Sequence, residues 1–539
     1  MLSGFPCSKR VRIVVTLALL GAAGACSDES AADNGTAQAG TAASSSGSGG
    51  VGATESAGSN ATGSGGSSGA ASGAAGSTAD GMGGRFAAGT GGDESAGQSG
   101  QAGTAGQGGA AGETAVAGTG GSAAPTPSDG DLIAAPDGRD DAAGTLAAPT
   151  TLTAAITRIA AGKALFLRGG TYAYDAQITI AADNSGAMDR PKTITAYEDE
   201  KPILDFSEQP YGASGNARGL QIEGSYWHVI GLTVRGSADN GIYIAGSHNV
   251  IERCVTHGNR DTGLQIGRAS SSTPDSQWPS HNLVLNCESY DNYDGPPGSG
   301  ENADGFAAKL TSGPGNVFRG CIAHHNIDDG WDLYTKSDTG PIGAVTIDQC
   351  VAHHNGTLTD GTSNGNGDRN GFKLGGERIA VGHTVTRSVS FANGKDGFTW
   401  NSNPGAIRIS NTLSFDNAQA NYRFGDNSTP TQAVFTNNVS FRSAAGGDGD
   451  KHVGSDVANS NVWSPNQNAQ APSVSAADFA GSLADPTLAR NPDGSIDFSP
   501  FRPATGSDLI NAGAVPAGEL PFDPTYYRGM PDLGAVETP

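Results

Sequence analysis

Asn302 to Asp332 reads NADGFAAKLTSGPGNVFRGCIAHHNIDDGWD, and the pattern of this stretch returns along much of the chain. A small, mostly polar residue recurs in seven successive segments, at intervals of 33, 34, 29, 38, 24 and 26 residues. These residues are Cys254, Cys287, Cys321, Cys350, Ser388, Thr412 and Asn438. Self-similarity at such a period is typical of solenoid proteins, in which each repeat forms one coil.

An asparagine follows this position by five residues in six of the seven segments. The column consists of Asn259, Asn292, Asn326, Asn355, Asn393 and Asn417, and Ser443 takes its place in the last segment. Stacked coils favour asparagine at one turn because each amide can donate to one neighbouring coil and accept from the other. Rings occupy the third position of the same segments, and we expect them to stack facing inward. They are His257, Tyr290, His324, His353, Phe391, Phe415 and Phe441.

A strand is expected after each asparagine turn, because two columns alternate there as they do on the two faces of a sheet. The apolar column, expected to face inward, is Ile242, Leu264, Phe306, Trp331, Phe372, Phe398 and Tyr422. The mixed column, expected to face outward, is Tyr243, Gln265, Ala307, Asp332, Lys373, Thr399 and Arg423. The agreement of these columns predicts an all-β fold, a right-handed parallel β-helix with coils from about Ile203 to Arg442.

The N-terminal residues 1–26 have the features of an export signal. Basic residues precede the apolar run Ile13–Leu20, which is too short to span a bilayer. The run is followed by Ala23-Gly24-Ala25-Cys26, which resembles a bacterial lipoprotein cleavage site with Cys26 as the lipid-bearing residue. The alternative is a simple signal peptide. Both predict an extracytoplasmic protein, either secreted or anchored to the outer membrane or cell surface through Cys26.

Residues 27–130 and 131–539 are expected to differ in kind. The first segment is mostly Gly, Ala, Ser and Thr, a composition that predicts a disordered tether. The second is the β-helix domain, irregular from about residue 448. Within it, Pro149–Ala161 places Leu152, Ala155, Ile156 and Ile159 on one face, which predicts a helix that caps the N-terminal end of the core.

The formal net charge of −23 argues against a nucleic-acid partner, because no basic cluster could hold phosphates. It also provides no general attraction for an anionic sugar polymer, so such a partner would have to be bound by a local site. We expect a monomer.

Acidic residues break the repeat in two neighbouring coils. In the register above, Asp304 and Asp329 occupy the same turn and should stack about 4.8 Å apart. Asp328 comes one residue before that turn, and Asp332 is the first outward residue after it. Four carboxylates on one exterior spot would repel each other without a cation, and an all-oxygen set suits Ca²⁺. Turn chemistry at an Asp-Gly corner is the alternative, but it explains a single aspartate better than four.

A lysine follows in the next coil. Lys373, in the sequence Gly371-Phe372-Lys373-Leu374, is expected in the outward column directly after Asp332. A nearby metal ion can lower the pKa of an amine and make it available as a base. The alternative is an ordinary solvated lysine.

The quoted run, followed by Gly371-Phe372-Lys373-Leu374, resembles the family 9 polysaccharide lyases, whose characterised members are mostly pectate lyases. The resemblance covers the β-helix and implies a calcium-dependent enzyme that cleaves polygalacturonate- or pectate-type uronate polymers by β-elimination. It gives calcium ligands at Asp304, Asp328, Asp329 and Asp332, and the base at Lys373. Calcium on the uronate carboxylate would stabilise the enolate-like transition state.

Two further features bear on the substrate. Arg423, two coils beyond Lys373 in the outward column, could hold a neighbouring uronate carboxylate. A long insertion from Gly356 to Asn370 could reshape the groove beside Lys373. The identity of the uronate polymer stays open.

Two other functions are compatible with a β-helix. A β-helical glycoside hydrolase would use two aspartates as acid and base, with no metal and no role for Lys373. A non-catalytic surface protein that binds glycans would suit the tether and anchor, but not the confinement of acid to two coils beside a lysine.

The paired histidines could bind a metal, and the cysteines could form disulfide bridges. His324-His325 and His353-His354 could suggest zinc, but one member of each pair belongs to the ring column. The four cysteines of the repeat could form the bridges Cys254–Cys287 and Cys321–Cys350, or stack as free thiols.

Overall fold

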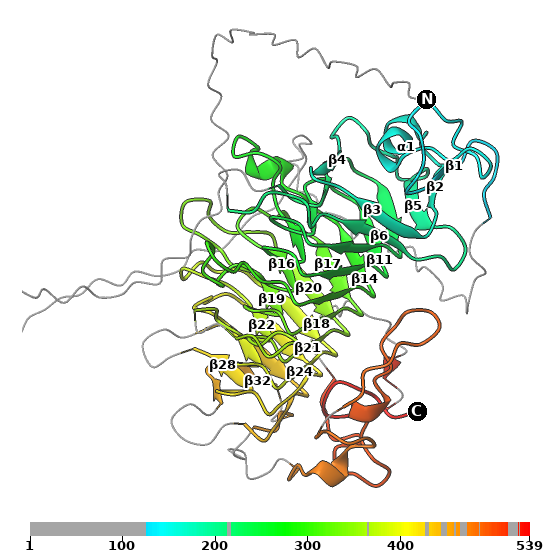
Figure 1. Ribbon diagram of the computed structural model, residues 1–539. Coiled ribbons are helices and arrows are strands. Elements are labelled where there is room, and N and C mark those ends of the chain that lie inside the picture. The colour runs from blue at the N-terminus through cyan, green and yellow to red at the C-terminus, as the bar shows by residue number, and fades with distance from the viewer. Residues whose placement is uncertain are drawn as a thin grey trace, which may run out of the picture. The chain divides into compact units, whose positions relative to one another are not determined.

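The computed structural model describes residues 126–212, 217–363, 366–425, 431–443, 450–457, 460–463, 472–484, 486–515, 526–527 and 529–539. Three parallel sheets run along these residues, one with 12 strands and two with 10 strands each (Figure 1). Successive coils contribute one strand to each sheet, which makes the fold an all-β parallel β-helix. The predicted fold class is confirmed.

The 12-stranded sheet follows the order of the coils. Its strands are β1 Leu132–Ala134, β2 Ala164–Leu167, β5 Lys192–Ala196, β8 Trp227–Ile230, β11 Val250–Glu252, β14 Leu283–Leu285, β17 Asn316–Arg319, β20 Val345–Asp348, β23 Thr384–Thr386, β26 Arg408–Ser410, β29 Val434–Thr436 and β32 Ser455–Asp456.

The two 10-stranded sheets carry the columns that the repeat defines. The sheet after the asparagine turn consists of β4 Ile178–Ile180, β7 Leu220–Ile222, β10 Ile242–Ile244, β13 Leu264–Ile266, β16 Phe306–Ala308, β19 Trp331–Asp332, β22 Phe372–Lys373, β25 Phe398–Thr399, β28 Tyr422–Phe424 and β31 Lys451–His452. The sheet before it consists of β3 Gly170–Ala173, β6 Pro202–Asp205, β9 Thr233–Arg235, β12 Val255–His257, β15 Glu288–Tyr290, β18 Ile322–His324, β21 Val351–His353, β24 Val389–Phe391, β27 Leu413–Phe415 and β30 Val439–Phe441.

The predicted strand register is confirmed residue by residue. Phe306 pairs with Trp331 and Trp331 with Phe372, all fully buried in the main apolar core. In the outward column, Asp332 pairs with Lys373 on the next coil. Thr399 and Arg423 continue this column, one and two coils further on. The coils begin earlier than Ile203, because β1 already pairs with β2.

The asparagine column forms a continuous buried ladder of side-chain hydrogen bonds. The amide of Asn259 donates to Asn292 at 2.9 Å, and the same contact repeats through Asn326, Asn355 and Asn393 to Asn417 at 2.8–3.0 Å. Asn417 then donates to Asn421 rather than to Ser443. A second ladder at another corner was not predicted, and its members are Asn249, Asn282 and Asn316.

The predicted inward direction of the ring column is wrong. On the sheet that contains β12 to β30, the middle residue of each strand points into the coil and is small: Thr256, Ser289, Ala323, Ala352, Ser390, Ser414 and Ser440 are all buried. Strand alternation therefore sends the rings to the outer face, where they stack at 4.8–5.0 Å from His257 through Tyr290, His324, His353 and Phe391 to Phe415.

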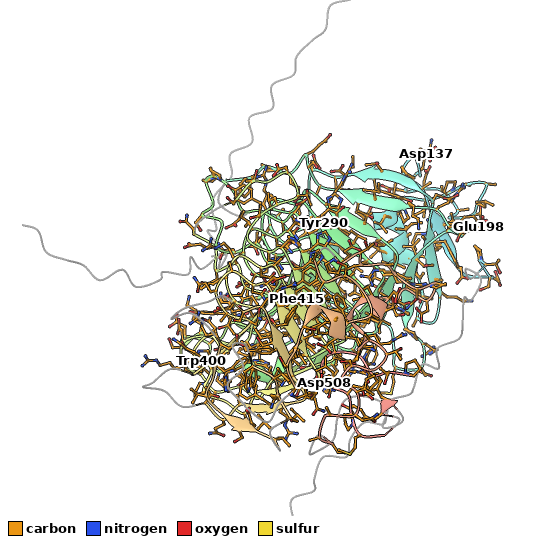
Figure 2. The ribbon with its side chains drawn as sticks, turned by 90° about the horizontal axis from the view of Figure 1, so that it is seen from below. Asp137, Glu198, Tyr290, Trp400, Phe415 and Asp508 are labelled. Carbon is orange, nitrogen blue, oxygen red and sulfur yellow. The ribbon has the colours of Figure 1, made fainter. Side chains whose placement is uncertain are left out.

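The C-terminal segment covers the phenylalanine end of this outer column. Phe391 and Phe415 form a second apolar cluster with Phe479, Phe501 and Leu509. In Figure 2, Phe415 lies beside the segment that carries Asp508, whereas Tyr290 lies farther along the solenoid. The polar rings thus stay at the surface, and the apolar rings are buried by the irregular chain that follows the coils.

The four cysteines of the repeat are buried free thiols, so the open question of disulfide bridges is answered in favour of unbridged stacking. Trp331, which belongs to the inward column, is buried in the main core as expected, and Trp400, two residues after Phe398 of the same column, is buried there too.

The ends of the domain differ in detail from the predictions. The helix α1, Leu152–Arg158, is shorter than Pro149–Ala161 because Thr151 caps it through a hydrogen bond from the backbone N–H of Ala154. Its apolar face lies in the core beside β1 and β2, but its capping role stays a prediction. The strands β31 and β32 extend the coils past residue 448, and irregular chain follows, with the short 3₁₀ helices η2 Ala476–Asp478 and η3 Ser499–Phe501.

The expected signal (1–26) and nearly all of the expected tether (27–130) lie outside the described residues. Within the described ranges, no helix has the length and apolarity needed to cross a membrane.

Candidate active site

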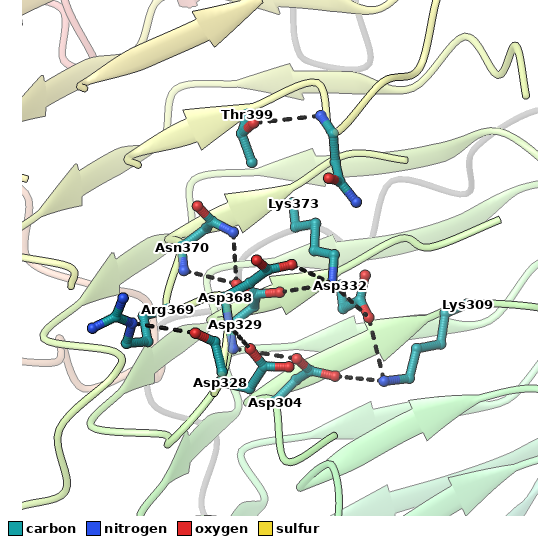
Figure 3. Close-up of polar contacts among 12 residues, drawn as sticks. Asp304, Lys309, Asp328, Asp329, Asp332, Asp368, Arg369, Asn370, Lys373 and Thr399 are labelled. Carbon is teal, nitrogen blue, oxygen red and sulfur yellow. Dashed lines mark hydrogen bonds and ion pairs between the residues drawn. The ribbon is translucent and has the colours of Figure 1, made fainter. Parts of the chain in front are cut away.

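Three adjacent strands, β16, β19 and β22, bring the predicted site residues together (Figure 3). Asp304 and Asp329 occupy equivalent turns just before β16 and β19, and Asp332 and Lys373 are paired residues of β19 and β22. Glycine is required in these turns, because a Cβ on Gly330 would lie 2.5 Å from the carbonyl oxygen of Gly371. The close stacking of the coils therefore depends on the same Asp-Gly turns that supply the carboxylates.

Asp304, Asp329 and Asp332 each offer a carboxylate oxygen within 4.8 Å of the other two. Oδ2 of Asp329 and Oδ1 of Asp332 are buried and accept no hydrogen bond. Oδ2 of Asp329 lies 3.3 Å from the ammonium of Lys373, whereas no ion pair reaches Oδ1 of Asp332 in the described part of the chain. A buried carboxylate oxygen without a donor is costly, and a cation in the cluster would satisfy that of Asp332. An all-oxygen donor set of this kind suits a hard divalent ion such as Ca²⁺.

The carboxylates were expected on an exterior spot, and this expectation is wrong. Asp304, Asp328, Asp329 and Asp332 are all buried, because the turns and the insertion around them cover the outward face of the sheet. Burial raises the pKa of Asp304 to about 7 and that of Asp329 to about 8, although Lys309 and Lys373, respectively, act in the opposite direction.

Asp328 lies next to the three clustered aspartates without joining them. Its Oδ1 accepts a hydrogen bond of 2.5 Å from the backbone N–H of Asp368. Burial, followed by the charge of Asp329, holds the pKa of Asp328 well above its usual value. The structure therefore brings three of the four predicted ligands to one point and ties the fourth to the neighbouring loop.

Lys373 was predicted to point outward into solvent, but only 3% of its side chain is exposed. Its ammonium lies 3.1 Å from Asp368, 3.3 Å from Asp329 and 3.8 Å from Asp332. Burial alone would lower the pKa of Lys373, but these carboxylates outweigh burial and hold the pKa well above its usual value. A buried amine in contact with the clustered aspartates is thus the second element of the site.

A second buried lysine, Lys309, was not predicted as a site residue. Its ammonium lies 2.7 Å from Oδ2 of Asp304 and 3.3 Å from Oδ2 of Asp332. Burial would lower its pKa, but Asp304, Asp332 and Asp261 together raise it well above the usual value. Asp332 therefore lies between two lysines, one on each neighbouring coil (Figure 3).

The insertion predicted between Gly356 and Asn370 supplies two further residues. The backbone and side-chain amides of Asn370 both donate to Oδ1 of Asp329, at 2.7 and 2.9 Å, and so fix that carboxylate. Asp368 contacts Lys373 and accepts a hydrogen bond of 2.6 Å from Lys395. Burial acts to raise the pKa of Asp368, but the two lysines outweigh it and lower the pKa.

The insertion is held against a second loop. Thr359 donates to Asp291 through its backbone N–H at 2.8 Å and through its hydroxyl at 2.5 Å. Asn366 donates to the backbone carbonyl of Ser299 at 3.0 Å. Because of these contacts, residues 356–363 and 366–370 pack against the coils and form one side of the site.

Arg423 lies where the outward column predicted, but it already has a partner. Its Nε donates to Oδ2 of Asp396 at 2.7 Å, and 20% of its side chain is exposed. Asp396 belongs to an Asp-Gly turn of the same kind on a later coil, and its other oxygen accepts a hydrogen bond from the backbone N–H of Ala420 at 3.1 Å.

The missed residues differ in how well the sequence signals them. Lys309 follows Ala307 by two residues, so strand alternation places it on the same outward face as the aspartates. Extending the outward column by one position would have found it. Asp368 lies in the insertion, which has no repeat, and therefore no register connects it with Lys373.

Comparison with known proteins agrees with this geometry. Residues 132–447 match the family described as "Pel9A-like, right handed beta helix region". The chain is 52% identical over 403 residues to "Pectate lyase L" of Paenibacillus polymyxa strain SC2, covering 74% of this chain and 87% of that protein. It is 35% identical over 401 residues to "Pectate lyase L" of Dickeya dadantii strain 3937, covering 72% and 86%. The crystal structure of pectate lyase Pel9A superposes with a TM-score of 0.62 at 34% identity, covering 75% of this chain and 96% of that one.

Proposed function

The chain belongs to the Pel9A-like family of right-handed parallel β-helix proteins, and we propose that it is a calcium-dependent pectate lyase. It is a polysaccharide lyase, and its proposed substrates are polygalacturonate- and pectate-type polymers, which it cleaves by β-elimination. The proposal is carried by one observation: three buried carboxylates converge within 4.8 Å beside the ammonium of a buried lysine.

Asp304, Asp329 and Asp332 would hold the calcium ion, with Asp328 as a fourth ligand once its hydrogen bond to the insertion is exchanged. The fit is supported by Oδ1 of Asp332, which is buried and accepts no hydrogen bond in the described part of the chain. Bound calcium would supply a positive charge for the uronate carboxylate and so favour loss of the neighbouring proton. Asn370 would keep Asp329 oriented, because it donates two hydrogen bonds to Oδ1 of that carboxylate.

Lys373 is the proposed base. It takes the proton from C5 of the uronate, the C4–C5 double bond forms, and the C4–O bond breaks with its electron pair passing to the leaving oxygen. The product has an unsaturated sugar at its new non-reducing end. Lys373 must be neutral to act, whereas the carboxylates around it raise its pKa. A cation on the same carboxylates would offset their charge and leave burial, which lowers the pKa of an amine.

Arg423 is the proposed contact for a neighbouring uronate carboxylate. Its ion pair with Asp396 holds the guanidinium in the outward column, and 20% of its side chain is exposed. If it acts in binding, Arg423→Ala should raise KM several-fold and change kcat little.

We also propose that the protein acts outside the cytoplasm as a monomer, either secreted or attached to the membrane only through a lipid on Cys26. The support for export and attachment is the signal-like composition of residues 1–26 and the cysteine at its end.

The experiment that tests the proposed function is incubation of the full chain with polygalacturonate, with and without a chelator. Ultraviolet absorbance of the unsaturated product should rise with calcium and stop when the ion is removed. Asp329→Ala should abolish most of the product at the same protein concentration. A β-helical hydrolase would release reducing ends without ultraviolet absorbance, and a glycan-binding protein would release neither.

A further inference from the structure

Lys309 is the lysine that contacts the clustered aspartates from the N-terminal side of the cluster. It follows β16 directly, and 11% of its side chain is exposed. Its ammonium makes a hydrogen bond of 2.7 Å to Asp304 and one of 3.3 Å to Asp332. Two of the three proposed calcium ligands are therefore engaged by one buried cation.

Oδ2 of Asp304, which accepts the hydrogen bond from Lys309, has no lone pair left for a further strong donor. Oδ2 of Asp304 also accepts a hydrogen bond of 3.0 Å from the hydroxyl of Thr262. A further acid, Asp261 on the preceding coil, also acts on Lys309 through its charge. Lys309 is thus surrounded by acids on three successive coils, of which only Asp304 and Asp332 belong to the cluster.

We propose that Lys309 is a built-in counter-ion of the calcium aspartates, which occupies them in the ion-free protein and competes with calcium for them. This inference rests on the proposed calcium site. A divalent ion on Asp304 and Asp332 would lie within a few ångströms of the ammonium and be repelled by it, so Lys309 must move away from these carboxylates or weaken binding. Lys309 neutralises part of the charge of the buried carboxylates before calcium binds. Because it also lowers the calcium affinity, the site fills only where the calcium concentration is high.

The test is calorimetric titration of the full chain with calcium chloride and no polysaccharide, in wild type, Lys309→Met, Lys309→Gln and Lys309→Arg. The two neutral variants should bind calcium at least about tenfold more tightly, because a like charge has been removed. Lys309→Arg keeps the charge and should stay within about threefold of wild type. Lys336→Met, in the loop after β19, is the matched control and should not change the affinity.

Thermal unfolding gives a second signal that a merely structural lysine would not produce. In chelator, the neutral variants should melt below wild type because Asp304 and Asp332 lose their cation. Calcium should raise their melting temperature by more than it raises that of wild type. Failure of Lys309→Met to fold in chelator, with recovery in calcium, supports the proposal in the same way.

Neutral variants that bind calcium as wild type does, or more weakly, would overturn the proposal, because Lys309 would then be a permanent support of the ligands. This outcome differs from failure of the proposed function. In that case the wild-type chain itself would show no calcium binding that Asp329→Ala removes.

Discussion

The ammonium of Lys373 lies 3.1 Å from Oδ2 of Asp368, although the two residues come from unrelated parts of the fold. Lys373 belongs to β22 of the regular sheet, and Asp368 belongs to the insertion that precedes it. Asp368 is itself held by Lys395 and by the contact of its backbone with Asp328. The insertion therefore presses a fixed carboxylate against the proposed base and limits the positions that its ammonium can take.

Asp368→Ala is expected to lower kcat by about 10- to 100-fold. Without Asp368 the ammonium of Lys373 is less well positioned, and a catalytic group that is present but out of place loses much of its rate enhancement. KM and calcium affinity should change little, since Asp368 contacts none of the three clustered aspartates directly in the described contacts. Asp368→Glu should recover part of the rate. Steady-state kinetics and calcium titration of the same preparations check this, and a wild-type kcat for Asp368→Ala would contradict it.

Calcium affinity should increase with pH between about 6 and 8.5. Burial raises the pKa of Asp304 to about 7 and that of Asp329 to about 8, above the value of 3.8 for an unperturbed aspartate. A carboxyl with a raised folded-state pKa contributes stability below its unfolded pKa, and this contribution is lost as pH rises through the folded pKa. The ion-free protein should lose this contribution between about pH 4 and pH 8.

Calcium should replace the lost protons over the same range, so the gap between the melting temperatures in calcium and in chelator should widen as pH rises. Thermal unfolding at several pH values, paired with calorimetry in two buffers to count released protons, measures both effects. A gap that is constant with pH would show that these aspartates are already ionised without calcium.

The asparagine ladder should contribute to the stability of the whole solenoid. Asn326 is fully buried, donates to Asn355 at 3.0 Å and to the carbonyl of Ser289 at 3.1 Å, and accepts from Asn292 at 2.8 Å. Asn326→Ala leaves these partners unsatisfied and should lower the free energy of unfolding by about 3 kcal/mol. Asn491→Ala, which removes an exposed contact with Ser495, should cost less than about 1 kcal/mol. Equal denaturation midpoints for the two variants would refute the role of the ladder.

The sequence predicted the fold and its register because periodicity constrains every coil at once. The pairing of Asp332 with Lys373 followed from aligning seven segments, and a register error would have disturbed all of them. The direction of the ring column was not fixed in this way. Tyr290 and Phe391 look like core residues, but the small Ser289 and Ser390 beside them fill the interior, and the rings face outward.

The site was predictable only where it coincides with the repeat. Asp304, Asp329 and Asp332 were located by their columns, whereas their burial depends on an insertion that no column describes. Lys309 could have been found by strand alternation, because it lies two residues beyond Ala307. Asp368 could not, because its approach to Lys373 is made by irregular chain whose path is set by contacts such as Thr359 with Asp291.

The measurement that tests the account most directly is the turnover of Lys373→Arg on polygalacturonate at saturating calcium, with Lys373→Ala beside it. Arginine keeps the charge among Asp329, Asp332 and Asp368 but is very hard to deprotonate. Because Lys373 is buried and paired, Lys373→Ala is expected to lose stability as well as rate, so arginine is the cleaner variant. Lys373→Arg is expected to remain folded and to bind substrate, while its turnover falls by about 10²–10⁴-fold, as it does when a positioned base is lost. Turnover near that of wild type would contradict the assignment of Lys373 as the base.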